Sequence, residues 1–302
     1  MKQVSYTMYA NIGASRIRMW LVLVIALSFI SACSSSSSDS PFFLPPSALS
    51  SGSSGFSCPA TVWPFMNAYL ADTVTEASGE QPNWAFGNSL CAANGIYGAG
   101  ANSGSTDVYS LRSSATATKC ESNEKCITLE WKGYRVKNTA GTDFVVFENP
   151  FNRSDSSRFI EAVIVEVSAD GSAWCGWSPA YTGEKDKANT NFATDIYDAT
   201  KYQDVAGLEP VLFNQSNWPH SAADIFDRSK AGGDHFDLSS LSFGNGTNCD
   251  AGLKADLQTN GFVYIRLTTA NSRNSTDFPL PGDSFDQTAD IDGVVARVVE
   301  AR

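Results

Sequence analysis

Short apolar runs, and apolar positions that alternate with polar ones, mark the C-terminal two thirds of this chain. Across Ile127–Trp131, apolar and polar side chains alternate in the pattern of a strand with one buried face. Similar segments rich in Val, Ile, Phe and Tyr predict strands over residues 107–111, 143–148, 159–168, 172–177, 261–269 and 293–299.

Turn chemistry favours antiparallel pairing of these strands. Asp170-Gly171 lies between Phe159–Ser168 and Ser172–Trp177, and an Asp-Gly pair between two β segments predicts a hairpin. No helical pattern alternates regularly with the strands, which argues against parallel βαβ units. The sequence therefore predicts an all-β, antiparallel β-sandwich with long loops and one or two short helices, one of them within Trp63–Thr75.

A long polar segment, 178–250, contains few strand candidates. A loop of this length beside a rigid scaffold is usually functional or poorly ordered, and loops are where binding sites are commonly carried. Four of its residues are candidate ligand-binding groups: Tyr202, Trp218, Asp234 and Asp237. Core packing is the alternative role for the aromatic members.

The N-terminus has the three parts of an export signal. Lys2, Arg16 and Arg18 precede the apolar run Trp20–Ile30, which is shorter than the roughly 20 residues needed to span a bilayer. Ile30-Ser31-Ala32-Cys33 then resembles the bacterial lipobox, which implies cleavage before Cys33 and lipidation of its thiol. An ordinary secretory signal cleaved after Ala32 and an uncleaved anchor are the alternatives.

The predicted organisation is a signal peptide over 1–32, a lipidated Cys33 with a Ser- and Pro-rich tether over 33–57, and one domain over 58–302. Cleavage would remove three basic and no acidic residues from a chain whose net charge is −11. So acidic a domain would repel nucleic acid, which we therefore do not expect as a partner. Ser34 after the lipidated cysteine favours the outer membrane by the sorting rule of enteric bacteria.

Six cysteines follow Cys33, and an even number in an exported protein predicts disulfides. Cys120 and Cys126 flank a short polar turn, so a local bridge is expected there. Elimination then gives the pairs Cys58–Cys91 and Cys175–Cys249. A zinc site is disfavoured because the chain has no C-x-x-C pair and only two histidines.

One hairpin resembles a known fold family. Val165–Trp174 (VEVSADGSAW) is similar to the strand–turn–strand of discoidin-like, galactose-binding-type jelly rolls, and Phe262–Leu267 (FVYIRL) is similar to a later strand of those domains. The resemblance implies a jelly-roll β-sandwich and identifies no ligand.

A wider resemblance spans most of residues 127–298. It rests on Asp143–Phe151 (DFVVFENPF), the VEVSADG hairpin, Ala231–Leu238 (AGGDHFDL) and Asp290–Gly293 (DIDG). Together these motifs resemble surface lipoproteins of Leptospira-type spirochaetes and related bacterial cell-surface proteins. That family implies an exported β-sandwich and no established biochemical activity.

Carboxylates near the strand ends suggest a structural Ca²⁺, because calcium takes oxygen ligands from carboxylates, amides and carbonyls. The expected ligands are Asp143, Glu148, Asp290 and Asp292, although solvated turn and cap residues would give the same pattern. An Asp/Glu pair could instead hydrolyse a glycan. We find no nucleophile motif, so enzymatic activity is uncertain and less expected than binding.

These observations together predict an outer-membrane surface lipoprotein. The membrane holds it through its lipid anchor, and the β-sandwich binds a glycan or an extracellular protein. A surface glycan hydrolase and a purely structural envelope lipoprotein are the alternatives.

Overall fold

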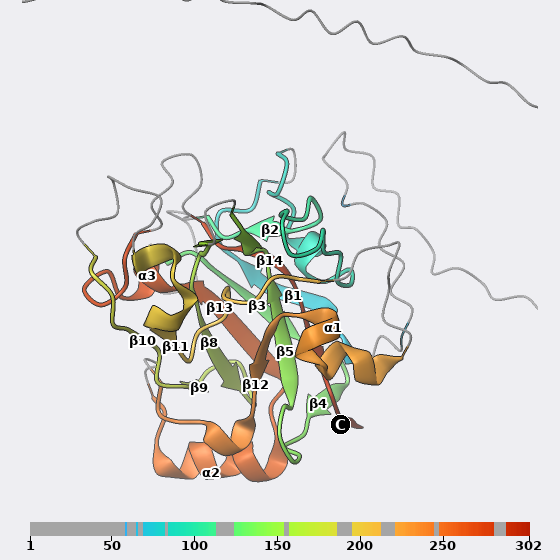
Figure 1. The fold of residues 1–302 in the computed structure, drawn as a ribbon. Helices are drawn as coiled ribbons and strands as arrows, with labels where there is room; N and C mark the ends of the chain where they lie inside the picture. The colour runs from blue at the N-terminus through green and yellow to red at the C-terminus, as the bar shows by residue number, and fades with distance from the viewer. Residues whose placement is uncertain are drawn as a thin grey trace, which may run out of the picture. The chain divides into compact units, whose positions relative to one another are not determined.

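Two antiparallel sheets face each other across an apolar core, with the four-stranded sheet in front of the five-stranded sheet in Figure 1. The computed structural model describes residues 58, 65, 69–81, 84–112, 124–153, 157–185, 195–212, 221–244, 248–280 and 288–302. The five-stranded sheet has the order β1 (Thr73–Ala77), β3 (Cys126–Glu130), β13 (Tyr264–Thr269), β8 (Val163–Ser168) and β9 (Cys175–Gly176). The four-stranded sheet has the order β12 (Asp234–Phe236), β5 (Phe144–Glu148), β14 (Asp290–Ala296) and β2 (Tyr109–Ser110).

The main core lies between these sheets and contains aromatic side chains from both of them. The Phe144 ring stacks on Phe236 with centroids 5.3 Å apart and meets Phe262 edge-on at the same distance. Trp131 packs edge-on against Phe262 at 5.4 Å. Each fully buried side chain of this size contributes about 1.5–3 kcal/mol relative to its exposed state, so this aromatic cluster joins the two sheets.

The outer face of the four-stranded sheet is also covered. Val145, Phe147 and Val295 point away from the main core and pack with Ile225 and Ala231 in a second apolar cluster. Ile225 belongs to η5 (Ala222–Phe226), and Ala231 ends α1 (Arg228–Ala231). Burial on both faces explains why β5 is a continuous apolar run in the sequence instead of an alternating one.

Three two-stranded ribbons and two further helices complete the described part of the chain. The ribbons are β4 (Tyr134–Val136) with β15 (Val299–Ala301), β6 (Phe151–Asn152) with β7 (Arg158–Phe159), and β10 (Ala180–Tyr181) with β11 (Tyr202–Gln203). The helices are α2 (Ala251–Asn260) and α3 (Ala270–Arg273), and the remaining elements are the 3-10 turns η2 (Ser89–Ala92), η3 (Asp195–Tyr197), η4 (Ala199–Lys201) and η6 (Leu238–Ser240).

The structure is mostly β with antiparallel sheets and few short helices, as the sequence predicts. The hairpin around Asp170-Gly171 is present as β8 paired with β9. Of the segment Trp63–Thr75, in which a short helix is predicted, residues Thr73–Thr75 belong to strand β1, and residues 63–64 and 66–68 lie outside the described residues. Cross-strand pairing stabilises this segment more than its local helix propensity does.

The described parts of segment 178–250 consist of short turns, the short helix α1 and short strands, one of which joins the main fold. β12 (Asp234–Phe236) pairs with β5 as the edge of the four-stranded sheet. The sequence analysis also missed α2, whose two signals are visible in the printed sequence. The Asp250 side chain caps the Leu253 amide at 2.8 Å, and Gly261 ends the helix with φ +84°.

Two predicted disulfides are present. Cys58 is bonded to Cys91 with a Cα–Cα distance of 5.3 Å, and Cys175 is bonded to Cys249 with a Cα–Cα distance of 5.0 Å. Cys126 is also disulfide-bonded, and its predicted partner Cys120 lies outside the described residues.

The described residues all belong to one compact unit, Gly52–Arg302. None of the helices in the described ranges has the length and hydropathy needed to cross a membrane. The predicted signal peptide, Cys33 and the tether, residues 1–57, lie outside the description.

The glycine pair before β12 gives a test of the fold. A β-carbon at Gly232, where φ is +71°, would lie 1.7 Å from the carbonyl oxygen of Pro210. We expect Gly232→Ala to lower the free energy of unfolding by roughly 3 kcal/mol, because backbone strain and overlap add. Gly100→Ala is the control, since its φ is +86° and a β-carbon there meets no atom within 4 Å. If urea denaturation showed the same loss in the free energy of unfolding for both variants, the close contact between the backbones of Pro210 and Gly232 would be contradicted.

Candidate functional site

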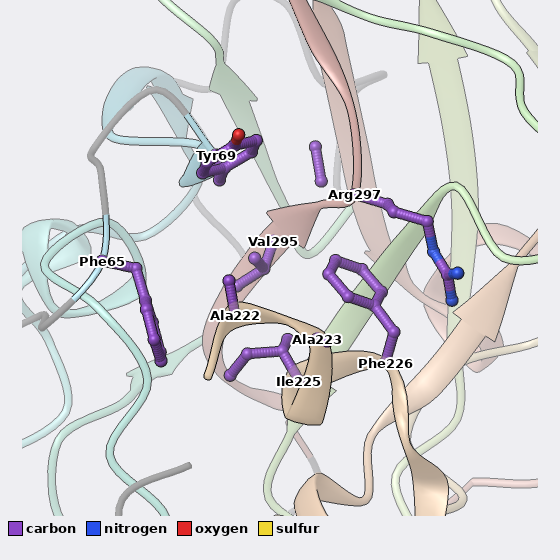
Figure 2. Close-up of a pocket in the computed structure, with 9 residues that line it drawn as sticks. Phe65, Tyr69, Ala222, Ala223, Ile225, Phe226, Val295 and Arg297 are labelled. Atoms are coloured by element: carbon purple, nitrogen blue, oxygen red, sulfur yellow. The ribbon is translucent and has the colours of Figure 1, made fainter. Parts of the chain in front are cut away.

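An open pocket with a cavity volume of about 350 Å³ lies on the outer face of the four-stranded sheet (Figure 2). Its wall is mainly apolar and comes from three segments that are distant in sequence. The lining residues are Phe65, Tyr69, Ala222, Ala223, Ile225, Phe226, Val295, Ala296 and Arg297. Its volume is within the range of about 300–1,000 Å³ that ligand pockets occupy.

Backbone pairing holds the three segments together. Leu70 forms a β-bridge with Val295, and the Ala71 amide donates to the carbonyl oxygen of Val294 at 3.0 Å, which places Tyr69 beside β14. On the opposite wall, Ser221 and Asp224 form a capping box at the start of η5. The cap fixes η5 against the sheet and presents its apolar residues to the pocket.

Arg297 is the charged residue of this pocket. Its guanidinium carbon lies 4.7 Å from the centroid of the Phe226 ring, and the two side chains lie next to each other in Figure 2. Within the described ranges, the Arg297 Nε is buried without a hydrogen-bond acceptor. The positive charge of Arg297 also acts on His235: burial, Arg228 and Arg297 together lower the pKa of His235 to about 4, so its imidazole is neutral near pH 7.

A second, more polar pocket of about 260 Å³ lies along edge strand β12. It brings together two of the predicted ligand-binding residues, Asp234 and Asp237. Its full lining is Trp177, Asp204, Val205, Leu208, Arg228, Asp234, His235, Phe236, Asp237 and Ser240.

Both aspartates also have structural roles. Asp234 Oδ2 accepts hydrogen bonds from the amides of Gly207 and Leu208 at 2.8 Å and 3.0 Å. The Asp237 carboxylate accepts from the Ser239 amide at 2.7 Å and caps η6. These contacts fix the loops that border the polar pocket.

Tyr202, another predicted ligand-binding residue, is not among the residues that line either pocket. Tyr202 is buried, its hydroxyl donates to the carbonyl oxygen of Ile196 at 2.9 Å, and its ring packs on Tyr181. It is therefore a core residue and offers no open face for stacking. Trp218 lies outside the described residues.

The sequence analysis did not select Phe226, Arg228 or Arg297, which line the pockets. Arg297 follows the apolar run Gly293–Ala296 and could have been noticed as a lone cation at the end of a buried strand. Nothing in the sequence indicates which loop covers that strand, so the pockets themselves could not be predicted.

The structure does not bring the four carboxylates predicted to bind calcium to one place. Asp143 and Glu148 lie at opposite ends of β5. Asp143 Oδ1 accepts from the Thr139 amide at 2.6 Å, and its Oδ2 accepts from the Leu238 amide at 2.8 Å. Both oxygens of Asp292 accept from the Tyr97 amide, at 2.8 Å and 3.0 Å. Asp143 and Asp292 therefore stabilise neighbouring loops.

Glu148 and Asp290 are the predicted ligands that lie together, since the Asp290 amide donates to Glu148 Oε1 at 2.9 Å. Among the described residues, the group of three potential metal ligands within 4.8 Å of one another is Cys58, Cys91 and Asp107. Both sulfurs of that group are in a disulfide, which leaves one carboxylate and no basis for a metal site there.

The role of Asp143 as a loop brace can be tested. Asp143→Ala removes the acceptor of the buried Leu238 amide, and an unsatisfied buried donor costs about 1–3 kcal/mol. We expect thermal unfolding to show a loss of this size, with a smaller loss in Asp143→Asn, which keeps an acceptor oxygen. A loss that appeared only when Ca²⁺ was present would contradict the brace and support a ligand role.

No protein-family model, curated protein or solved structure matches this chain. The site therefore has to be interpreted from its own chemistry: an apolar pocket bordered by one arginine, and a polar pocket along the adjacent edge strand.

Proposed function

We propose that this protein is a surface lipoprotein whose folded domain binds an extracellular protein. Cys33 carries the lipid, and the Ser-rich tether displays the domain from the outer membrane. We also propose that the two-sheet domain is a jelly-roll β-sandwich of the galactose-binding type. The hairpin formed by β8 and β9 supports this, because it falls on the motif VEVSADGSAW.

The observation that carries the binding function is the pocket of Figure 2. Phe65, Tyr69 and Phe226 are half-buried aromatic residues around its apolar wall. Aromatic residues and Arg are enriched in protein interfaces, where an anchoring side chain fills a pocket of this kind. The described lining offers few hydrogen-bonding side chains, so it suits an apolar anchor better than a polyhydroxylated sugar.

The charge of Arg297 indicates which groups of the partner would lie beside the apolar side chain that fills the pocket. The chain has a net charge of −11, and Arg297 places a positive charge beside the apolar pocket of this acidic molecule. An acidic group next to the apolar anchor would pair with the guanidinium of Arg297, which is half-buried at the pocket. The proposed ligand is therefore a protein segment with a large apolar side chain beside Asp or Glu.

The test is a peptide array in which Phe, Leu or Trp is flanked by Asp or by Lys. We expect the full-length protein to prefer the Asp-flanked peptides. Ala223→Trp should fill the pocket and weaken their binding at least tenfold, since Ala223 is exposed and can be enlarged at little structural cost. Ala255→Trp, on an exposed position of α2, is the matched control. Equal binding by both variants, or a preference for Lys flanks, would overturn the proposal.

The polar pocket favours a glycan as the second candidate ligand. Asp204, Arg228 and Asp237 provide donors and acceptors on one rim, and sugars are recognised by such convergent polar groups. The rings of Trp177 and Phe236 in its wall are buried, so they offer little stacking surface.

A glycan array distinguishes this candidate. We expect Arg228→Gln to abolish any glycan signal of the wild type while leaving binding of Asp-flanked peptides unchanged, because Arg228 lines the polar pocket and not the apolar one. A glycan signal that survived Arg228→Gln and disappeared in Ala223→Trp would place the sugar in the apolar pocket and contradict this assignment.

A further inference from the structure

Two large apolar side chains lie exposed close together in the sequence, at one end of the sandwich. Trp84 and Leu90 are the most exposed large apolar residues in the part of the chain that is described, at 61% and 60%. The carbonyl oxygen of Phe86 between them accepts from the Ser110 amide at 2.9 Å, so this segment lies beside β2. Large apolar side chains that gather on a surface in this way mark a site of interaction.

The backbone holds Trp84 in a closed turn. The Gln81 amide donates to the carbonyl oxygen of Gly87, and the Trp84 amide donates to the carbonyl oxygen of Gln81, both at 2.9 Å. Phe86 has a φ of +62°, which residues with a side chain seldom adopt. Strain of this kind is found most often at functional sites. The exposure of Trp84 is therefore a property of a defined turn.

This segment carries no charge. Residues 81–106 contain no Asp, Glu, Lys, Arg or His, in a chain of which 18% is charged and whose net charge is −11. The acids at its two ends do not face the surface freely: Glu80 Oε1 accepts from the Ser89 hydroxyl at 2.7 Å, and Asp107 is fully buried. A surface that enters lipid must avoid taking unpaired charges out of water. The segment around Trp84 and Leu90 meets this condition.

The same segment adjoins the point where the N-terminal chain enters the fold. Cys58 is bonded to Cys91, which directly follows Leu90 in the sequence. In the proposed function, the 24 residues between Cys33 and Cys58 are the tether to the membrane. A Ser-rich linker of this length has an r.m.s. end-to-end distance of about 25–30 Å. The lipid anchor would therefore keep Trp84 and Leu90 close to a bilayer surface.

We propose that Trp84 and Leu90 dock the folded domain on the lipid surface that holds its anchor. This inference rests on the lipid anchor of the proposed function. Trp is enriched at the membrane–water interface, because its ring is apolar and its N–H remains at the level of the headgroups. The guanidinium carbon of Arg112 lies 5.8 Å from the centroid of the Trp84 ring, where it can pair with a lipid phosphate. Docking would direct the β2 end toward the membrane and α2, at the opposite end in Figure 1, away from it.

The experiment measures contact between Trp84 and lipid. The lipidated full-length protein is reconstituted into phosphatidylcholine vesicles with plain or brominated acyl chains, because bromine quenches the fluorescence of a nearby indole. Bromination should lower the emission of the wild type more than that of Trp84→Phe. We expect the difference to reach about one sixth of the emission, since Trp84 is one of six tryptophans after Cys33. Leu90→Gln should reduce this difference, because it removes the second apolar side chain.

A matched control moves the exposed indole to another face. Ala255→Trp, added to Trp84→Phe, places it on an exposed position of α2, and bromination should cause no additional quenching there. Equal quenching at position 255 and at position 84 would contradict docking through a defined face.

Flotation of the vesicles in a density gradient reports the lipid anchor separately. If the protein floats but bromination quenches the wild type and Trp84→Phe equally, the anchor stands and the docking is wrong, and Trp84 and Leu90 are then free to contact a protein. If the protein does not float and Trp84 is not quenched, both the anchor and the docking are wrong.

Discussion

Strand β5 is the constraint on which the other features depend. All five of its residues, Phe144–Glu148, are buried, and they pair with β12 on one side and β14 on the other. Its one face supplies Phe144 and Val146 to the main core, and its other face supplies Val145 and Phe147 to the cluster beneath the apolar pocket. A change in its register by one residue would exchange the two faces. The core and the pocket floor are thus fixed by one strand.

The carboxylates at the two ends of this strand have different hydrogen-bonding roles. Asp143 accepts amides from two loops, and so it satisfies backbone donors that would otherwise be buried without partners. Glu148 keeps an unsatisfied oxygen beside Asp234 and Gly207. Elsewhere, buried acids are neutralised directly: Glu166 contacts Arg266 at 2.7 Å and Arg273 at 2.8 Å. Among the described residues, the Glu166 network therefore has its own cations, whereas Glu148 Oε2 has no partner.

The proposed functions rest on separate parts of the fold. The apolar pocket uses the outer face of the four-stranded sheet, and the polar pocket follows edge strand β12. β12 contributes Asp234 and His235 to the lining of the polar pocket. Asp234 accepts hydrogen bonds from the amides of Gly207 and Leu208, so it fixes the loop that borders the polar pocket.

The sequence by itself predicted strands where the structure has β3, β5, β8, β13 and β14, the hairpin at Asp170-Gly171 and two disulfide pairs, because these depend on local periodicity, turn chemistry and cysteine counting. It selected Asp234 and Asp237 as candidate ligand-binding residues, and both of them line the polar pocket. The sequence could not show which acids accept hydrogen bonds from backbone amides. Both oxygens of Asp143 accept from loop amides, whereas Glu148 Oε2 has no partner among the described residues. Only the tertiary structure brought Tyr69, Phe226 and Arg297 to one pocket, because the pairing of strands with distant loops depends on packing across the whole core.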